Sequence, residues 1–163
     1  KENATLKALD YSRQTGLLAL ADDSGLEVDA LGGLPGLHSA RYGCLGTSDL
    51  EPAAKLLSAL EPFKASNRSA RFITVMVLAA PQAEATVINV STGLCEGSIA
   101  RTLRGTNGFD YDPVFIPRGF QQTFGELPPE IKNRISHRAR ALLHTRDFIE
   151  GWIGKLDLVC DAS

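Results

Sequence analysis

Ala21-Asp22-Asp23-Ser24-Gly25 is the stretch around which the chain is organised. It follows a short apolar run, Leu17-Leu18-Ala19-Leu20, which has the length of a strand. It precedes Leu26-Glu27-Val28-Asp29-Ala30-Leu31, where apolar and acidic residues alternate with the period of a second strand. Ser24 and Gly25 favour a turn between the two strands. The sequence therefore predicts two adjacent carboxylates on a turn at the end of a buried strand.

Asp22 and Asp23 have two interpretations. Adjacent carboxylates in such a place are costly unless a cation or hydrogen-bond donors compensate them. Mg²⁺ prefers oxygen ligands and often shares them with substrate phosphates, so one interpretation is a magnesium and phosphate site. The other is a solvated Asp-Asp-Ser-Gly turn. These five residues alone favour the solvated turn.

Length and composition limit the classes of protein to consider. A chain of 163 residues, with 44% hydrophobic and 22% charged residues, is expected to form a single domain spanning 1–163. Its net charge of -2 offers no general attraction for DNA or RNA, so no nucleic-acid polymer is expected as a partner. Three distant cysteines indicate neither a disulfide framework nor a zinc cluster. No apolar run has membrane-spanning length, so we expect no membrane partner and a cytoplasmic location.

The chain begins with a helical pattern. Residues 1–14 place Leu6, Leu9 and Ser12 at helical spacing, and Gly16 suits the cap that ends the helix. A chain seldom begins inside a helix, so we expect upstream residues to be missing from this sequence. Further on, Ser48 or Asp49 is predicted to cap a helix that ends near Pro62.

The middle of the chain is predicted to be a sheet. Residues 70–80 are rich in β-branched and apolar side chains, and residues 85–91 form a second such run. The connection 81–84 indicates a hairpin, and residues 93–103 are predicted as a third antiparallel strand. Mixed with the helices, these strands indicate an α/β fold with a mixed, partly antiparallel sheet.

Two helices are predicted near the end of the chain. Pro128 and Pro129 open a short helix, and Ser136 caps a longer one. The longer helix is predicted to bury a stripe of large apolar side chains. This stripe comprises Leu142, Leu143, Ile149, Trp152, Ile153 and Leu156.

Three further clusters have residue types suited to chemistry. Gly108-Phe109-Asp110-Tyr111-Asp112-Pro113 would expose an aromatic ring for base stacking beside two acidic acceptors, although such a segment is more often a packed loop. Lys132 with Ser136-His137-Arg138 would bind phosphate or a carbonyl group, or would form a solvated basic face. Glu2 is either a further metal ligand or an exposed helical acid.

Taken together, these stretches resemble the inosine triphosphate pyrophosphatase family. The resemblance covers 21–31, Pro35-Gly36 and Ser39-Ala40-Arg41-Tyr42, with Glu2-Asn3-Ala4 upstream. It continues through Gly108-Phe109, Tyr111-Asp112-Pro113, Lys132 and Ser136-His137-Arg138, in the family's order and spacing. One such motif is weak support, whereas this ordered set spans nearly the whole chain.

The resemblance implies a two-lobed α/β fold around a central cleft, usually as a homodimer. It also implies Mg²⁺-dependent hydrolysis of ITP, dITP and XTP to the monophosphate and pyrophosphate. Asp23 matches the family's general base and metal-associated carboxylate, supported by Asp22, and Glu2 matches a second metal ligand. The implied substrate contacts are Ser24, Phe109, Asp110, Tyr111, Asp112, Lys132, His137 and Arg138.

The sequence departs from the family's pattern at two places. Family members begin with a strand and a Ser/Thr-Gly-Asn-x-x-Lys phosphate loop upstream of Glu2, and this segment is absent here. Because backbone amides in such a loop cradle phosphates, we expect the chain to bind substrate poorly without it. Asp110 stands where the family usually has Gly, so we expect an altered base pocket.

Three other functions fit part of the pattern. A nucleotide pyrophosphatase for modified pyrimidines is disfavoured by Ser136-His137-Arg138. A non-catalytic nucleotide-binding module is disfavoured by the acidic residues Glu2, Asp22 and Asp23, since adjacent anions help no pure phosphate binder. A protein-interaction domain would show no Mg²⁺-dependent nucleotide turnover.

Overall fold

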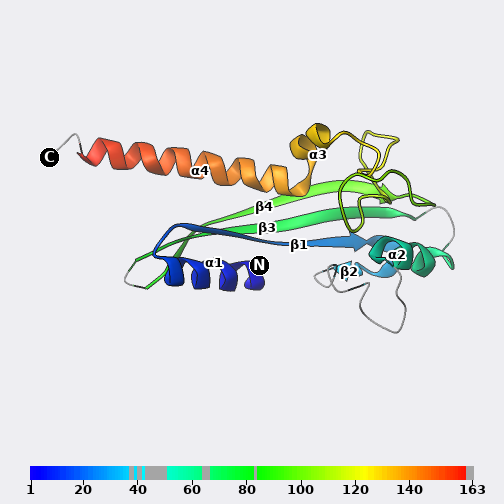
Figure 1. Ribbon diagram of the computed structural model, residues 1–163, viewed down its shortest axis with the longest axis horizontal. Coiled ribbons are helices and arrows are strands. Elements are labelled where there is room, and N and C mark those ends of the chain that lie inside the picture. The colour runs from blue at the N-terminus through cyan, green and yellow to red at the C-terminus, as the bar shows by residue number, and fades with distance from the viewer. Residues whose placement is uncertain (37–38, 40–41, 43–50, 64–66, 83, 161–163) are drawn as a thin grey trace. The chain divides into compact units, whose positions relative to one another are not determined.

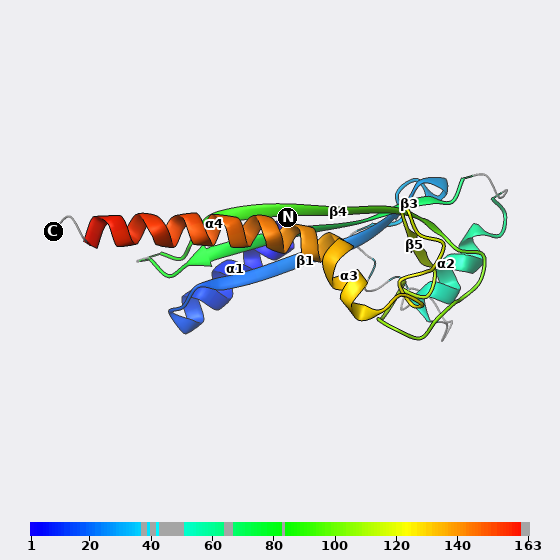
Figure 2. The same cartoon turned by 90° about the horizontal axis from the view of Figure 1, so that it is seen from above.

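The fold is an α/β arrangement with one sheet (Figures 1 and 2). The computed structural model describes residues 1–36, 39, 42, 51–63, 67–82 and 84–160, with side chains up to residue 153 of the last helix. The sheet has the strand order β2-β1-β3-β4-β5, and β2 and β5 pair antiparallel with β1 and β4. The predicted α/β class with a partly antiparallel sheet is confirmed. The elements are α1 (Glu2–Thr15), β1 (Ala19–Val28), η1 (Asp29–Leu31), β2 (Pro35–Gly36), α2 (Pro52–Leu60), β3 (Ser69–Ala80), β4 (Thr86–Ile99), β5 (Phe115–Pro117), α3 (Pro129–Ile135) and α4 (His137–Cys160).

β1 corrects the prediction of a turn at Asp22-Asp23-Ser24-Gly25. Residues 19–28 form one continuous strand between β2 and β3, so the acidic pair lies within a strand. Hydrogen bonds from neighbouring segments hold this backbone extended: the Leu26 N–H donates to Ser39 Oγ at 2.8 Å, and Thr74 Oγ1 donates to the Asp23 carbonyl at 3.3 Å. Pairing on both sides of the strand therefore outweighs the local turn preference of Ser and Gly.

The second predicted strand also ends earlier than expected. β1 stops at Val28, and Asp29–Leu31 form the single 3₁₀ turn η1. Gly32 and Gly33 then adopt φ values of 64° and 90°, which reverse the chain so that β2 pairs back onto β1. Only glycine reaches these dihedrals at no steric cost, which explains the position of this turn.

β4 joins two segments that were predicted as separate strands. Residues 86–91 of the first segment and the first part of 93–103 lie in the single strand Thr86–Ile99, beside the predicted central strand β3. Ladder hydrogen bonds to its neighbours carry β4 through Gly93, despite the weak strand preference of glycine. Gly97 also permits the close approach of β5, because a Cβ at Gly97 would lie 2.2 Å from the Ile116 carbonyl oxygen.

The first three helices follow the sequence signals closely. α1 ends where predicted, with Gly16 in the left-handed region at φ 68°, although its buried face is Ala4, Ala8 and Ser12. α2 begins at Pro52 with Glu51 at the cap position, whereas the predicted caps Ser48 and Asp49 lie outside the described residues. α3 begins at Pro129, as its proline pair predicts.

α4 does not bury the predicted apolar stripe. Leu142, Leu143 and Ile153 are exposed, whereas Ala141 and Thr145 are buried and Thr145 Oγ1 hydrogen-bonds to Ser91 Oγ at 3.0 Å. Residues four apart share a helix face, so Ala141, Thr145 and Ile149 make one stripe. The large apolar residues of α4 lie on more than one face of the helix, whereas small residues, Ala141 and Thr145, form much of the buried face. The side chain of Leu156 lies outside the described part of the chain.

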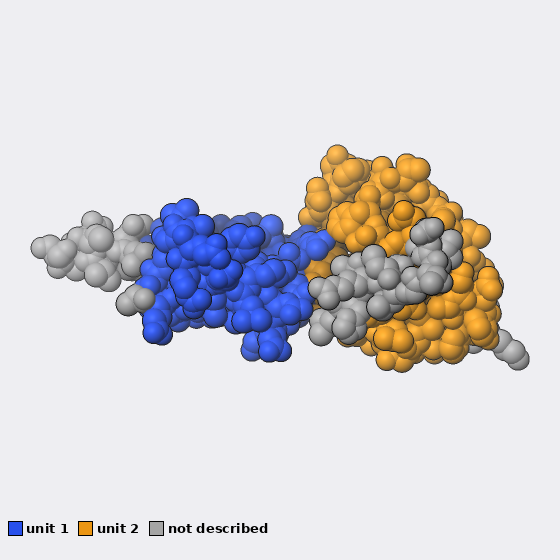
Figure 3. Space-filling model, turned by 60° about the horizontal axis from the view of Figure 1, so that its bottom comes forward, with its two compact units in different colours: residues 1–23, 74–93, 138–163 blue, residues 24–73, 94–137 orange. Residues whose placement is uncertain are grey.

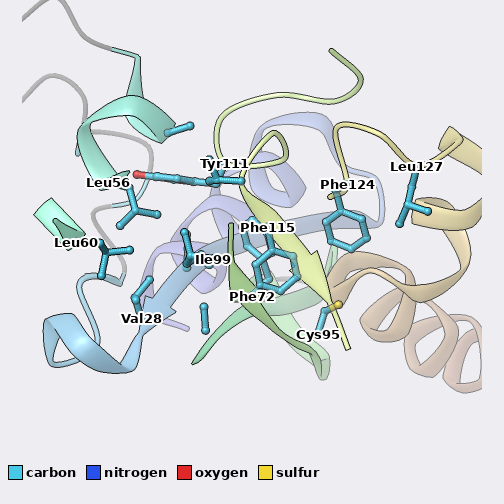
Figure 4. Close-up of a cluster of buried hydrophobic side chains, with 14 residues drawn as sticks. Val28, Leu56, Leu60, Phe72, Cys95, Ile99, Tyr111, Phe115, Phe124 and Leu127 are labelled. Carbon is cyan, nitrogen blue, oxygen red and sulfur yellow. The ribbon is translucent and has the colours of Figure 1, made fainter. Parts of the chain in front are cut away.

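Residues 1–163, predicted as a single domain, divide into two compact units (Figure 3). Unit 1 comprises 1–23, 74–93 and 138–163, and unit 2 comprises 24–73 and 94–137. Each has its own core. Unit 1 packs Ala4 and Ala8 of α1 against Val77 and Ala79 of β3. Unit 2 packs a larger, aromatic cluster, part of which Figure 4 labels: Val28, Leu56, Leu60, Phe72, Cys95, Ile99, Tyr111, Phe115, Phe124 and Leu127. None of the helices in the described residues is long and apolar enough to cross a membrane.

Candidate functional site

Asp22 and Asp23 belong to unit 1, where β1 presents them on opposite faces. They are therefore not the crowded carboxylate pair expected of a turn. The Asp23 side chain is 15% exposed, while that of Asp22 is 35% exposed. The two carboxylates consequently have different surroundings and different partners, and they are suited to different roles.

Asp23 has a buried carboxylate oxygen that lacks a hydrogen-bond partner, Oδ2. The backbone nitrogen of Lys1 is 4.0 Å from this oxygen, which is beyond hydrogen-bond distance. The start of α1 thus lies near the Asp23 carboxylate, and Glu2 is the first residue of that helix. A buried carboxylate oxygen without a hydrogen bond is costly, and a cation would relieve that cost.

Arg138, the second residue of α4, pairs with Asp22 within unit 1. Its Nε donates to Asp22 Oδ2 at 2.8 Å, and both side chains are partly exposed. Lys7 also donates from its ammonium group to the Asp22 carbonyl. Asp22 therefore acts as an anchor for Arg138, a contact across 116 residues of sequence that no local pattern indicates.

The candidate stacking residue, Phe109, lies in unit 2 on a loop with unusual backbone geometry. Gly108 has φ 77° and Asp110 has φ 53°, so both lie in the left-handed region. Asp tolerates this region better than most residues, which explains how it stands where Gly is usual in the family it resembles. The side chain of Phe109 is 56% exposed, and its ring is accessible.

Asp112 organises this loop from inside. Its Oδ2 accepts a hydrogen bond from the Phe109 N–H at 2.8 Å and forms an ion pair with Lys132 of α3. The Lys132 ammonium then lies 4.5 Å from the centre of the Phe109 ring. A Cβ at Gly108 would lie 2.0 Å from Asp112 Oδ2, so only glycine leaves room for the carboxylate. Asp112 thus fixes both an exposed ring and a cation beside it.

Tyr111 supports the same loop from its other side. Its side chain is buried, and its hydroxyl donates to the Ser39 carbonyl at 2.9 Å. Burial, with smaller contributions from Asp110 and Tyr42, raises the pKa of the Tyr111 phenol well above its usual value. Ser39 links this contact to β1 by accepting the Leu26 N–H. No local pattern in the sequence indicates this role of Ser39, because only the fold brings the two segments together.

The remaining predicted contacts, Ser24 and His137, also lie in unit 2. Ser24 follows Asp23 in β1 and is partly exposed. The ring of His137 is buried and stacks on Phe72, with centroids 4.7 Å apart and an angle of 11° between the ring planes. His137 is therefore packed into the core of unit 2 at the first residue of α4.

The structure thus forms two sets of predicted residues, one in each unit. Asp22 and Arg138 contact each other in unit 1, where the start of α1 also approaches Asp23. Phe109, Asp112 and Lys132 contact one another in unit 2. Among the described residues, no three His, Cys, Asp or Glu side chains are grouped to hold a metal ion. A cation here would need oxygen ligands from elsewhere, such as substrate phosphates and water.

Comparisons with known proteins agree with the resemblance. The model of the Ham1 family matches residues 1–148. A dITP/XTP pyrophosphatase of Methylococcus capsulatus is 51% identical over 140 residues, which cover 86% of this chain and 69% of that protein. A HAM1 protein structure from Coxiella burnetii superposes with a TM-score of 0.82 at 44% identity, over 92% of this chain and 76% of that one. A Ham1 protein structure from Staphylococcus aureus gives a TM-score of 0.79 at 39% identity, with the same coverage.

The match of the family model to most of the chain and the high identity of these relatives lead to one conclusion. The sequence identity of this chain to both solved structures, 44% and 39%, is well above the level at which two proteins share only a fold. The chain belongs to the Ham1 family.

Proposed function

We propose that this chain is a nucleoside triphosphate pyrophosphatase. It hydrolyses the non-standard purine nucleotides ITP, dITP and XTP to the monophosphate and pyrophosphate, and so removes them from the nucleotide pool. The observation that carries this proposal is its 51% identity to a dITP/XTP pyrophosphatase across most of the chain. The loop of unit 2 supports it, because an exposed ring beside a fixed cation suits the binding of a base.

The proposed hydrolysis requires Mg²⁺, for which the residues of unit 1 are suitable. Asp23 and Glu2 would hold the ion, since Asp23 Oδ2 is a buried carboxylate oxygen that lacks a hydrogen bond. When bound, Mg²⁺ polarises the phosphoryl oxygens as a Lewis acid. Two protein carboxylates are a usual number for Mg²⁺, because it commonly takes its other ligands from phosphates and water.

Each proposed residue has a distinct chemical task. Asp23 accepts a proton from the water that attacks the α-phosphorus, as a general base. Lys132 offsets charge on the substrate, and its position is fixed by its ion pair with Asp112. Phe109 stacks on the base, while Asp110, Tyr111 and Asp112 shape the loop that presents it.

Selectivity for a 6-keto purine is proposed to come from Arg138. A guanidinium has donors only, so it can bind the O6 of hypoxanthine or xanthine but not the 6-amino group of adenine. The ion pair with Asp22 orients this guanidinium. Ser24 and His137 complete the proposed substrate contacts. Guanine also carries O6, so the site must exclude GTP through the 2-amino group of its base.

A pyrophosphate-release assay tests this function. Purified protein is given ITP, dITP, XTP, GTP and ATP, each with and without Mg²⁺. We expect ITP and XTP to be hydrolysed far faster than ATP, with GTP intermediate or poor, and with no turnover in EDTA. A site that uses a buried hydrogen bond can discriminate by about 10⁴-fold. Equal rates on ITP and ATP would contradict the proposed selectivity, and release of orthophosphate would contradict the reaction.

We also propose a cytoplasmic homodimer. Large apolar side chains on α4, namely Leu142, Leu143 and Ile153, are exposed, and such side chains are typical of interfaces between copies of a chain. Light scattering coupled to gel filtration gives the mass directly. A monomer at all accessible concentrations would contradict the dimer.

A further inference from the structure

Unit 2 has a pocket that is lined by none of the residues proposed to act in the hydrolysis. Its volume is about 500 Å³, which lies within the range of about 300–1,000 Å³ that is typical of small-molecule sites. Three arginines line it, Arg68, Arg101 and Arg104, together with the hydroxyl residues Ser69, Ser98 and Thr102. None of the described residues that line it is acidic. A pocket of this composition favours an anion.

Arg68 is held rigidly at the pocket wall. Its Nε donates to the Ile99 carbonyl and its Nη2 to the Ala100 carbonyl, both at 2.7 Å. Its own carbonyl accepts the Ile99 N–H at 2.8 Å. Ile99 in turn lies in the aromatic core of unit 2, as Figure 4 shows. The guanidinium is therefore positioned before any ligand arrives, which lowers the entropic cost of binding.

Arg101 brings a second positive charge close to Arg68. Burial, and then the charge of Arg101, lowers the pKa of the Arg68 guanidinium. Among the described residues, no carboxylate forms an ion pair with Arg68 or with Arg101. Two cations that repel each other without a counter-ion are a cost to the folded chain, and a bound anion would remove that cost.

The charge of the pocket indicates the charge of its ligand. Arg104 is partly neutralised by Glu126, whose Oε2 lies 3.4 Å from its Nε, and its Nη2 donates to the Gln121 carbonyl. Arg68 and Arg101 then leave about two uncompensated positive charges. A singly charged carboxylate would neutralise only one of them. A phosphate group carries up to two negative charges and several acceptor oxygens, which suit guanidinium and hydroxyl donors.

We propose that this pocket binds a phosphoanion: a free inorganic pyrophosphate or the phosphate groups of a nucleotide. The residues that carry it are Arg68, Arg101 and the hydroxyls of Ser98 and Thr102. This site is separate from the residues proposed for hydrolysis. Binding at this site can therefore be tested independently of the proposed function.

A titration followed by amide NMR tests the proposal. Sodium pyrophosphate is added to the ¹⁵N-labelled full chain in low-salt buffer with EDTA. We expect saturable shifts at the backbone amides of 68 and 98–102. Arg101→Gln should raise the dissociation constant for pyrophosphate, measured at these amides, by about tenfold or more, because it removes a charged donor. Arg101→Lys, which keeps the charge, should lose less than Arg101→Gln.

A matched control separates a built site from general attraction. Arg13 is an exposed arginine of α1 in unit 1, and Arg13→Gln changes the net charge by the same amount. This variant should bind pyrophosphate at 98–102 as the wild type does. The absence of saturable shifts at these amides with any probe, or equal weakening by Arg13→Gln and Arg101→Gln, would overturn the proposal.

A second probe distinguishes the two sources of the anion. The titration is repeated with an α,β-methylene analogue of ITP, whose scissile bond is blocked. Saturation of the amides 98–102 at lower concentration by pyrophosphate would assign the site to the free anion. Saturation at lower concentration by the analogue would assign it to a nucleotide. Both results support a phosphoanion site, and neither depends on the enzyme's turnover.

Discussion

Removal of the charge on Asp112 should destabilise unit 2 and disturb the loop that presents Phe109. We expect Asp112→Asn to lower the free energy of unfolding by about 2–3 kcal/mol. The Asp112 side chain is 4% exposed and that of Lys132 is 19% exposed, so the substitution leaves a largely buried ammonium without its counter-ion. Loss of one partner of a buried pair costs about 3–5 kcal/mol. The lower value applies because Lys132 retains some contact with water and Asn can still accept the Phe109 N–H.

Thermal denaturation measures this effect. A loss of that size lowers Tm by about 5–10 °C in a chain of this length. Glu96→Gln is the matched control, since it removes a carboxylate from an exposed pair in the same unit, that of Arg118 with Glu96 at 2.5 Å. This control should change stability by less than about 0.5 kcal/mol.

A double-mutant cycle isolates the pair itself. Lys132→Met removes the buried charge, so adding it to Asp112→Asn should restore part of the lost stability, with a coupling of about 1 kcal/mol or more. Additivity within about 0.3 kcal/mol would refute the reasoning, because the two side chains would then not depend on each other. An unchanged Tm in Asp112→Asn would also refute the reasoning.

Further outcomes follow from single features of the two units. Asp23→Asn should lower turnover by roughly 10²–10⁴-fold in the pyrophosphate assay, while Tm holds or rises because the charge on a buried oxygen that lacks a hydrogen bond is removed. Arg138→Ala should reduce turnover of ITP far more than that of ATP; equal losses would assign Arg138 to the phosphates or to the fold. Gly108→Ala should cost about 2–4 kcal/mol by thermal denaturation, against about 1–2 for Gly119→Ala, since both have positive φ but only the former meets a side chain. Absorbance titration should show one phenol that ionises well above pH 10 and that is absent in Tyr111→Phe. Because folding raises the pKa of Tyr111, the stabilising effect of the neutral phenol is full below about pH 10 and is lost as the pH rises further.

Local signals in the sequence predicted part of the fold correctly. The end of α1 at Gly16 and the start of α3 at the proline pair depend on residues whose own backbone preferences decide the structure. The central strand β3 was found because its β-branched residues have no competing pattern. The sequence also indicated the loop at Phe109, since Gly108 and Asp110 both suit a left-handed backbone.

Other features depend on partners far away in the chain and have no local signal. β1 passes straight through a segment that prefers a turn, because its neighbours in the sheet satisfy its backbone. Arg138 is held by Asp22, and Tyr111 by Ser39, across 116 and 72 residues. Arg71 pairs with Glu27 at 2.7 Å and with Asp29 at 3.2 Å, which no spacing indicates. The inward face of α4 was missed because small residues form it.

The segmented construction of unit 1 affects how the chain can fold as it is made. Unit 1 takes its residues from three separate stretches, and its last helix, α4, supplies the partners of Asp22 and Ser91. At about 5–20 residues per second, the 116 residues from Asp22 to Arg138 take roughly 6–23 s to synthesise. All residues of unit 2 have been synthesised once His137 is added. The residues of unit 2 therefore precede nearly all of α4 along the growing chain, and its core can form before Asp22 and Ser91 meet their partners in α4.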